Sequence, residues 1–593
     1  MSIKYTFLSE NEKLAGTALQ VCNDENGKFS VLQYKAEGCL RYSHQRGMYS
    51  EDEKMQTERI CEFLKMAQKQ GSDLVIAPEA SVPLAVVKKI ICGEFIPEAG
   101  KLWCLGGEGI AKEDYKDLLE EWNQNDEIIF IHSEAINFGK YVNAMFYFFL
   151  AADGRLTMVL QAKIGGMRDI FFAHEQADLS TGTELFVVDL HGAKKAENVL
   201  VTLICADILN INAIEFCNTF HGKSPIVVNI QMNAKPFHGK IVEFRRSFFG
   251  DGLIRNGQLL AANWGRGTSI RQEGAVEPPR GHSDSGSVIY LSIEHNHGED
   301  TLKEILTQPK FVEHIGETQQ SGLEYFLTNT YELWKIQEDI QVASYFLKRG
   351  YRQNTKSNIL EKRYLPYIVE KYRFNSGNRL EADTERKCDC LEVNEILQMM
   401  GSKRASRDIK KCAGQSCREC VRFYIDALVS LCLGEDVLEE YLVSDGKSRK
   451  ASQTLYQDSK EKKKKENLGK LVKCLTEKKF PERFGEFREN DDFCFVVNYD
   501  AAKNGGDNKY NLELQRANRN PRRILVAFLG YMNLEDIRQK YIEIKASVHE
   551  ERQADILLYY IDDNGRQVYS EPYEQTSISI HNNDFSQNIE SFK

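Results

Sequence analysis

Hydrophobic residues occur in short runs throughout residues 1–300, and longer stretches of mixed polarity separate the runs. A short apolar run bounded by glycine, proline or acidic residues is typical of a buried strand. The pattern therefore predicts strands at 73–77 (DLVIA), 102–107 (LWCLGG), 127–132 (EIIFIH), 144–151 (AMFYFFLA), 156–162 (LTMVLQA), 199–204, 225–230 (PIVVNI), 258–263 (QLLAAN) and 285–292 (SGSVIYLS). The Asp153-Gly154 pair between two of these runs predicts a tight hairpin turn.

Helical periodicity appears between the predicted strands. One apolar face repeats every three to four residues, at Ile60, Phe63, Leu64 and Ala67. Ser50 with Glu53 predicts a capping box at the start of this helix, and Gly71 predicts its end. A second helix, rich in charge, is predicted over 238–256. This alternation of strands and helices predicts an α/β fold.

Composition narrows the class of protein. A chain of 593 residues is too long for a single hydrophobic core, so we expect two to four domains. Its formal charge of −10 argues against binding nucleic acid over the whole surface. The 15 cysteines are dispersed, the first residues lack a secretory signal, and no apolar run is long enough to cross a bilayer. These features predict a cytoplasmic protein with reduced thiols.

Three reactive side chains each lie just past a buried strand: Glu79, Lys163 and Cys205. A free thiol needs a base or a nearby cation to attack at neutral pH. A carboxylate can take its proton, and an ammonium group can stabilise the oxyanion that forms. We also expect the backbone N–H groups of Ala206 and Asp207 to support that oxyanion. The competing interpretation is that Cys205 is an inert buried cysteine.

These residues resemble the carbon–nitrogen hydrolase (nitrilase) superfamily. The glutamate motif is matched by DLVIAPEAS (73–81), the lysine motif by YVNAMFYFFLAADGRLTMVLQAKIG (141–165), and the cysteine motif by LICADILN (203–210). The order of the three motifs is that of the family. AANWGRGT (261–268) and GHSDSGSVIY (281–290) resemble its closing strands and the loop between them.

The resemblance implies an αββα sandwich that pairs with a second copy, and it implies a homo-oligomer. It makes Glu79 the general base, Lys163 the oxyanion stabiliser and Cys205 the nucleophile, and it implies no cofactor. Glu175 matches the additional glutamate of the family, with Glu134 as the weaker alternative. The implied reaction attacks an amide or nitrile carbon through a thioester. Pocket segments such as IGGMRDI, after Lys163, depart from the family pattern, so the substrate stays open.

No family resemblance extends to the second half of the chain. We expect a nitrilase-like domain at 1–300, a connecting or assembly segment at 301–345, a mainly helical basic region at 346–480 and a small α+β domain at 481–593. Aromatic and basic residues mixed over 326–374 favour helices there, with a solvated basic face or a nucleic-acid surface as alternatives.

The terminal domain is predicted from strands at 494–499, 523–530 and 555–562 and a helix at 534–549. A cluster of cysteines precedes it, at Cys388, Cys390, Cys412, Cys417 and Cys420. Only one pair in the cluster has the C-x2-C spacing of a zinc knuckle, so packing is favoured over a metal site.

Two classes of function follow from the sequence. The first is a cysteine-dependent hydrolase of a small-molecule amide or nitrile, with a regulated role in bacterial anti-phage defence as one setting. The second is a catalytically weak scaffold whose C-terminal half binds a partner protein or nucleic acid. An activated Cys205 is expected to react with iodoacetamide well below pH 8, whereas a scaffold cysteine is not.

Overall fold

The computed structural model of the chain describes a set of ranges separated by gaps. They are 3–21, 28–166, 175–190, 198–233, 239–250, 253–254, 257–265, 268–273, 280–281, 287–292, 322–327, 331–336, 340–348, 366–383, 480–484, 493–497, 512–516, 523–547, 555–562, 564–570 and 589–592. The cysteine cluster at 388–420 lies outside the described residues.

A nine-stranded sheet carries the glutamate and lysine motifs. Its order is β25-β24-β23-β2-β5-β6-β11-β12-β8. The strands are β2 (Lys28–Tyr34), β5 (Leu74–Val82), β6 (Leu102–Gly107), β8 (Ile128–His132), β11 (Ala144–Leu150), β12 (Leu156–Ala162), β23 (Val342–Lys348), β24 (Tyr367–Phe374) and β25 (Leu380–Ala382). The Asp153-Gly154 hairpin is confirmed, since β11 and β12 pair antiparallel and Gly154 has a φ of 85°.

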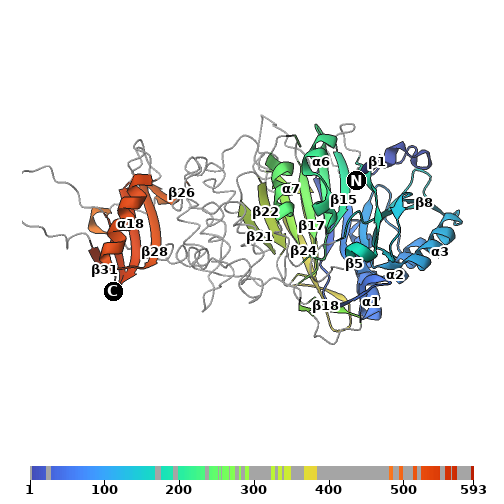
Figure 1. Ribbon diagram of the computed structural model, residues 1–593, viewed down its shortest axis with the longest axis horizontal. Coiled ribbons are helices and arrows are strands. Elements are labelled where there is room, and N and C mark those ends of the chain that lie inside the picture. The colour runs from blue at the N-terminus through green and yellow to red at the C-terminus, as the bar shows by residue number, and fades with distance from the viewer. Residues whose placement is uncertain are drawn as a thin grey trace, which may run out of the picture.

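An eight-stranded sheet carries the cysteine motif and faces the first sheet (Figure 1). Its order is β1-β14-β15-β16-β17-β20-β22-β21. The strands are β1 (Lys4–Phe7), β14 (Glu184–Asp189), β15 (Asn198–Ile204), β16 (Ser224–Ile230), β17 (Gln258–Ala262), β20 (Val288–Ser292), β21 (Leu323–Leu327) and β22 (Tyr331–Ile336). Because β15, β16 and β17 run parallel, their carboxyl ends share one edge.

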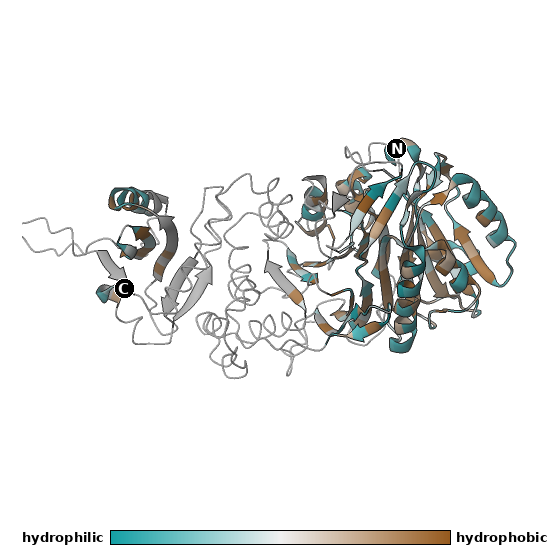
Figure 2. Cartoon of the chain, turned by 90° about the horizontal axis from the view of Figure 1, so that it is seen from below, coloured by the Kyte–Doolittle hydropathy of each residue, from teal (hydrophilic) through white to brown (hydrophobic). Residues whose placement is uncertain are grey.

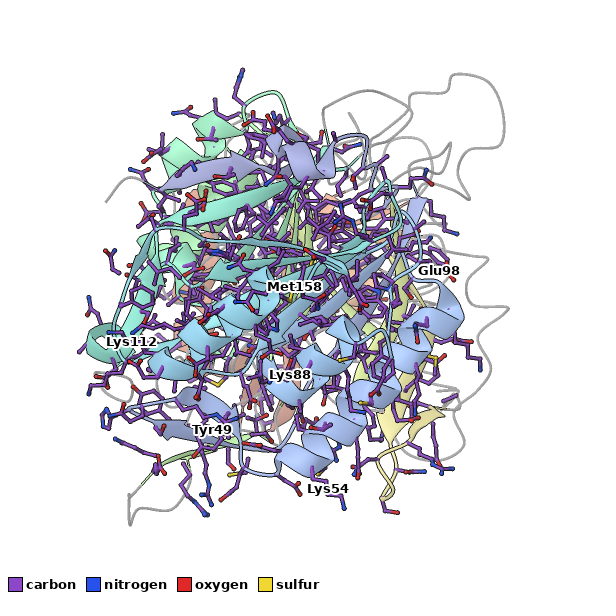
Figure 3. The ribbon with its side chains drawn as sticks, turned by 90° about the vertical axis from the view of Figure 1, so that its right-hand side faces the viewer. Tyr49, Lys54, Lys88, Glu98, Lys112 and Met158 are labelled. Atoms are coloured by element: carbon purple, nitrogen blue, oxygen red, sulfur yellow. The ribbon has the colours of Figure 1, made fainter. Side chains whose placement is uncertain are left out.

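Helices cover the outer faces of both sheets, which gives the predicted layer order of helix, sheet, sheet, helix. On the nine-stranded sheet lie α1 (Glu53–Gln70), α2 (Leu84–Ile91) and α3 (Lys112–Asn123), whose apolar faces pack on strand residues such as Met158 (Figure 3). On the other sheet lie α6 (Ala213–Thr219) and α7 (Gly239–Gly250). The exposed sides of the helices are hydrophilic, as burial of one face requires (Figure 2).

Two glutamine side chains link the sheets across their interface. Gln161 on β12 donates to the Thr202 carbonyl over 2.9 Å, and its Oε1 accepts the Phe186 N–H over 3.0 Å. Gln33 on β2 donates to the Ala261 carbonyl over 3.0 Å. A buried amide must find such partners, so these bonds hold the sheets in one relative position.

The predicted start of α1 was wrong by two residues, while its end was confirmed. Asp52 is the N-cap and accepts the Met55 N–H over 2.9 Å. Ser50 cannot cap the helix because it ends β4 (Gly47–Ser50), where it pairs with Leu40 of β3 (Cys39–Ser43). Gly71 ends the helix in the left-handed conformation, with a φ of 56°.

The prediction of helices over 326–374 was wrong wherever the structure describes that stretch. Strands β22, β23 and β24 occupy it, and β21 and β25 flank them. They extend both sheets of the sandwich, because β22 pairs with β20 and β23 pairs with β2. Short runs such as YELWKI fit a buried strand or a buried helix equally well, and only the partner strands decide. The rest of 301–345 and 346–480 lies largely outside the described residues.

The C-terminal residues form a separate six-stranded sheet. Its order is β26-β27-β28-β29-β30-β31, with bounds Phe493–Val497, Leu512–Arg516, Arg523–Tyr531, Asp555–Asp562, Gly565–Tyr569 and Ile589–Phe592. Helix α18 (Leu534–Ser547) joins β28 to the parallel β29 and packs on it. The three predicted strands and the predicted helix are confirmed. Within the described ranges, no helix has the length and apolarity needed to span a membrane.

Candidate active site

Glu79 lies near the end of an irregular strand, β5. We expected the strand to end at Ala77, but β5 continues to Val82 with a break in its register to β6 between those two residues. Ala80 has a φ of 55°, a conformation that a residue with a side chain rarely adopts. Such strain persists only where the surroundings impose it, and it is common at functional sites.

Lys163 follows β12 directly, as predicted, and its ammonium group binds two carboxylates. Its Nζ donates to Glu79 Oε1 and to Glu175 Oε1, each over 2.7 Å. Its own backbone is fixed as well, because its N–H donates to the Asn143 carbonyl over 2.8 Å. Only 2% of the Lys163 surface is exposed, so the three charges form a buried cluster.

Glu79 is held by three partners and keeps one oxygen unused. Its Oε1 accepts the Asn143 amide over 2.7 Å in addition to the Lys163 ammonium, and its carbonyl accepts the Trp264 indole N–H over 2.6 Å. Its Oε2 is buried and has no hydrogen-bond partner among the described residues. A buried carboxylate oxygen without a donor is unfavourable unless it has a task, such as accepting a proton.

Cys205 follows β15 at a sharp, strained turn. Its φ is 45°, and its N–H donates to the Ile230 carbonyl of the neighbouring strand over 2.7 Å. Of the three non-glycine residues with positive φ in the described ranges, Cys205 and Ala80 flank this site. Only 4% of the Cys205 surface is exposed, so the thiol is buried.

Charge interactions couple Cys205 to both Glu79 and Lys163. Burial raises the pKa of the Cys205 thiol well above its usual range, and the Glu79 carboxylate raises it further. The Lys163 ammonium and the backbone N–H of Met232 act against this rise without reversing it. Fast alkylation of Cys205 below pH 8 stays a prediction, and the raised pKa of the buried thiol acts against it.

The charge on Lys163 is secure. Burial works to lower the pKa of Lys163, but the carboxylates of Glu175 and Glu79 outweigh it and hold that pKa well above its usual range. The side chain is therefore an ammonium group at neutral pH. It brings a fixed positive charge to the site before any substrate arrives.

The side chain of Asp207 joins the cysteine turn to the chain after Lys163. Its Oδ2 accepts the Ile204 N–H over 2.9 Å, while its Oδ1 accepts the N–H groups of Ile164 over 2.9 Å and Gly165 over 3.2 Å. Burial raises the pKa of Asp207 to about 7. We expected support from its backbone alone. Ala206, as predicted, follows Cys205 and precedes the short α5 (Asp207–Asn210).

Glu175, rather than Glu134, reaches the site. Glu175 begins the short α4 (Glu175–Asp178) and is 7% exposed. Glu134 is exposed and interacts instead with Lys4. Across the described ranges, no group of three or more His, Cys, Asp or Glu side chains is arranged to hold a metal ion.

Sequence reasoning missed the residues that hold the site in shape. Trp264 anchors the glutamate turn through its indole. Asn263 donates to the Asn233 carbonyl over 2.8 Å and so fixes the segment whose Met232 N–H reaches the Cys205 sulfur. The stretch AANWGRGT was noted only as closing strands, and no spacing rule marks its tryptophan as a partner of Glu79.

No protein-family model matches the sequence, and no curated protein matches it. One similar solved structure is Nit3 of Saccharomyces cerevisiae, a branch 10 member of the nitrilase superfamily, at 16% identity and a TM-score of 0.27, over 44% of this chain and 82% of that one.

A second is the glutamine-dependent NAD+ synthetase of Acinetobacter baumannii, at 13% identity and a TM-score of 0.31, over 68% of this chain and 52% of that one. Scores this low carry no argument about function. The resemblance to the nitrilase superfamily therefore rests on the sequence motifs, and the chemistry of the site is argued from the geometry of Glu79, Lys163 and Cys205.

Proposed function

We propose that the chain is a cysteine-dependent hydrolase of a non-peptide C–N bond in a small amide or nitrile. One observation carries the proposal: Lys163 bridges Glu79 and Glu175 in a buried cluster that is electrostatically coupled to the Cys205 thiol. A structural ion pair would not need an unused glutamate oxygen or a strained cysteine turn beside it.

The first half of the reaction forms a thioester. Glu79 takes the thiol proton as the Cys205 sulfur attacks the carbonyl carbon of an amide, so the S–C bond forms as the S–H bond breaks. The raised pKa of the resting thiol fits a proton transfer that accompanies attack, because formation of the S–C bond offsets the cost of deprotonating a buried thiol. The Lys163 ammonium stabilises the oxyanion, and the Ala206 and Asp207 N–H groups are assigned as its support.

The second half releases the product. Protonated Glu79 returns its proton to the leaving nitrogen as the C–N bond breaks, and ammonia or an amine departs. Glu79 then takes a proton from water, whose oxygen attacks the thioester carbon. The C–S bond breaks, the thiol regains the proton and a carboxylic acid leaves. Throughout, Asn143 and Lys163 hold the other carboxylate oxygen, so the reacting oxygen keeps its direction.

Metabolite profiling tests the proposal without a known substrate. Cells that express the wild type should lose one or more amides or nitriles and gain the matching acids, whereas cells that express Cys205→Ala should not. Cys217→Ala is the matched control, because Cys217 is an equally buried cysteine on α6 outside the site. Equal profiles from wild type and Cys205→Ala would overturn the proposed chemistry.

The alternative of a scaffold that binds a partner protein or nucleic acid stays a prediction, as do the homo-oligomer, the cytoplasmic location and the role in anti-phage defence. A wild-type profile identical to that of cells without the protein would favour the scaffold. No contact among the described residues favours it over the hydrolase.

A further inference from the structure

We propose that Gln341, which directly precedes β23, is a positioning residue for the Glu79–Cys205 site. It acts through Glu37 and the segment that carries Trp264. The inference rests on the proposed function only for the statement that the site is catalytic. It goes beyond that function because it places control of the site in strands β23 to β25, which follow the region of family resemblance.

The first step is a hub of four hydrogen bonds at Gln341. Its carbonyl accepts the Lys35 N–H over 2.7 Å, and its own N–H donates to the Tyr372 carbonyl over 3.1 Å. Its side-chain amide donates to Glu37 Oε2 over 2.8 Å and accepts the Phe374 N–H over 2.7 Å. One residue thus ties strand β24 to the chain that leaves β2.

A second link, from helix α1, fixes the same segment after β2, residues 35–37. Arg59 on α1 donates to the Glu37 carbonyl over 3.2 Å and to Asn378 Oδ1 over 3.0 Å. Asn378 belongs to the turn between β24 and β25, and this hairpin lies beside α1 (Figure 3). Glu37 is therefore held at its carboxylate by Gln341 and at its carbonyl by the Asn378–Arg59 pair.

Residues 35–37 in turn contact residues 263–265, the segment that holds the Glu79 carbonyl. The Gly265 N–H donates to the Ala36 carbonyl over 2.7 Å. A Cβ at Gly265 would lie 2.7 Å from Glu37 Cγ, so the glutamate side chain packs directly on this glycine. The preceding residue is Trp264, whose indole holds the Glu79 carbonyl over 2.6 Å.

The same segment reaches the nucleophile. Asn263 precedes Trp264 and accepts the Asn233 N–H over 3.0 Å, next to the Met232 N–H that reaches the Cys205 sulfur. Displacing Glu37 therefore loosens both the base and the nucleophile. A side chain that only stabilised β24 would have no such route to the sulfur.

Alkylation of Cys205 by iodoacetamide measures this coupling without a substrate. A buried thiol reacts through locally open forms, so its rate reports how often its surroundings open. Gln341→Ala removes two side-chain hydrogen bonds from the hub, and losing one such bond changes an opening equilibrium about 2- to 10-fold. We expect the Cys205 rate to rise by at least that factor, measured on its peptide by mass spectrometry.

Two controls separate positioning from general loosening. Gln70→Ala also removes a bridge between α1 and β24, because Gln70 donates to Glu370 and Tyr372, but these hydrogen bonds do not involve residues 35–37. Cys104, buried on β6, reports wider opening of the sandwich in the same sample. We expect a Cys205 rise only in Gln341→Ala, with Cys104 unchanged.

Equal Cys205 rates in Gln341→Ala and Gln70→Ala would overturn the inference, and so would a parallel rise at Cys104. If Gln341→Ala does not fold, Asn378→Gly tests the second link, because glycine tolerates the φ of 58° at that position. It should raise the Cys205 rate alone, and an unchanged rate there would also count against the inference. Neither result bears on the proposed reaction, which the metabolite profiles test separately.

Discussion

Lys163→Met removes the charge from the centre of the site and shortens the side chain by only its terminal atom. It deletes two hydrogen bonds to buried carboxylates. A hydrogen bond to a charged group contributes about 1.5–3 kcal/mol, so the pair contributes about 3–6 kcal/mol. Part of this lost stability is offset because the variant has no ammonium group to desolvate. Breaking a buried ion pair generally costs about 3–5 kcal/mol. We expect the free energy of unfolding to fall by that amount.

Tryptophan fluorescence during urea unfolding measures this change on the sandwich alone. The chain has four tryptophans, and Trp103, Trp122, Trp264 and Trp334 are all buried in the sandwich and its helices. In the wild type, Lys163 stays charged at neutral pH because its pKa is raised, so Lys163 itself adds no pH dependence to stability there.

The control is Lys101→Met. Lys101 pairs with Asp73, but both side chains are partly exposed, so we expect a loss of no more than about 1 kcal/mol. If Lys163→Met unfolds at the same urea concentration as the wild type, the buried three-charge cluster is not present in solution. The oxyanion role assigned to Lys163 would then have no structural basis.

Two further changes probe the backbone around the site. Because burial raises the pKa of Asp207 to about 7, its contribution to stability is greatest near pH 4 and falls, by up to about 4 kcal/mol, as the pH rises to 7. Asp207→Asn cannot titrate and should flatten that part of the stability profile; an unchanged profile would contradict the assignment. Gly106→Ala places a Cβ 2.2 Å from the Pro78 carbonyl oxygen and 2.7 Å from the Glu79 Cα. It should cost about 1–3 kcal/mol and abolish the metabolite changes, whereas Gly377→Ala, which has room for a methyl group, should do neither.

Strand ends were the part of the site that the sequence could reveal. Apolar runs fix where β12 and β15 stop, so Lys163 and Cys205 were predicted at the correct positions. The partners of those residues could not be found in this way. Asn143 stands within the lysine motif at 141–165, but Trp264 acts through one indole N–H, and nothing in its sequence neighbourhood distinguishes it from a packing residue.

The strands after residue 320 show the opposite limit. The composition of these segments did not decide between helix and strand, because that choice depends on partners far away in the sequence. Strand β23 pairs with β2, for example at Tyr345 and Val31. A short run that mixes aromatic and basic residues is compatible with either a helix or a strand, and its packing partners decide between them. Local pattern therefore predicted helices where tertiary pairing produces strands.

The resting state of the site follows from how its charges are distributed. Lys163 already satisfies one oxygen of Glu79 and one of Glu175, the remaining Glu79 oxygen has no hydrogen-bond donor among the described residues, and burial raises the pKa of the Cys205 thiol. A thiolate formed in advance would react with any small electrophile that entered. A thiol that loses its proton only as the S–C bond forms reacts instead with a substrate whose electrophilic carbon is held at the sulfur. In the proposed reaction, burial of Cys205 thus contributes to selectivity, and the strands that hold Glu37 become a means of adjusting it.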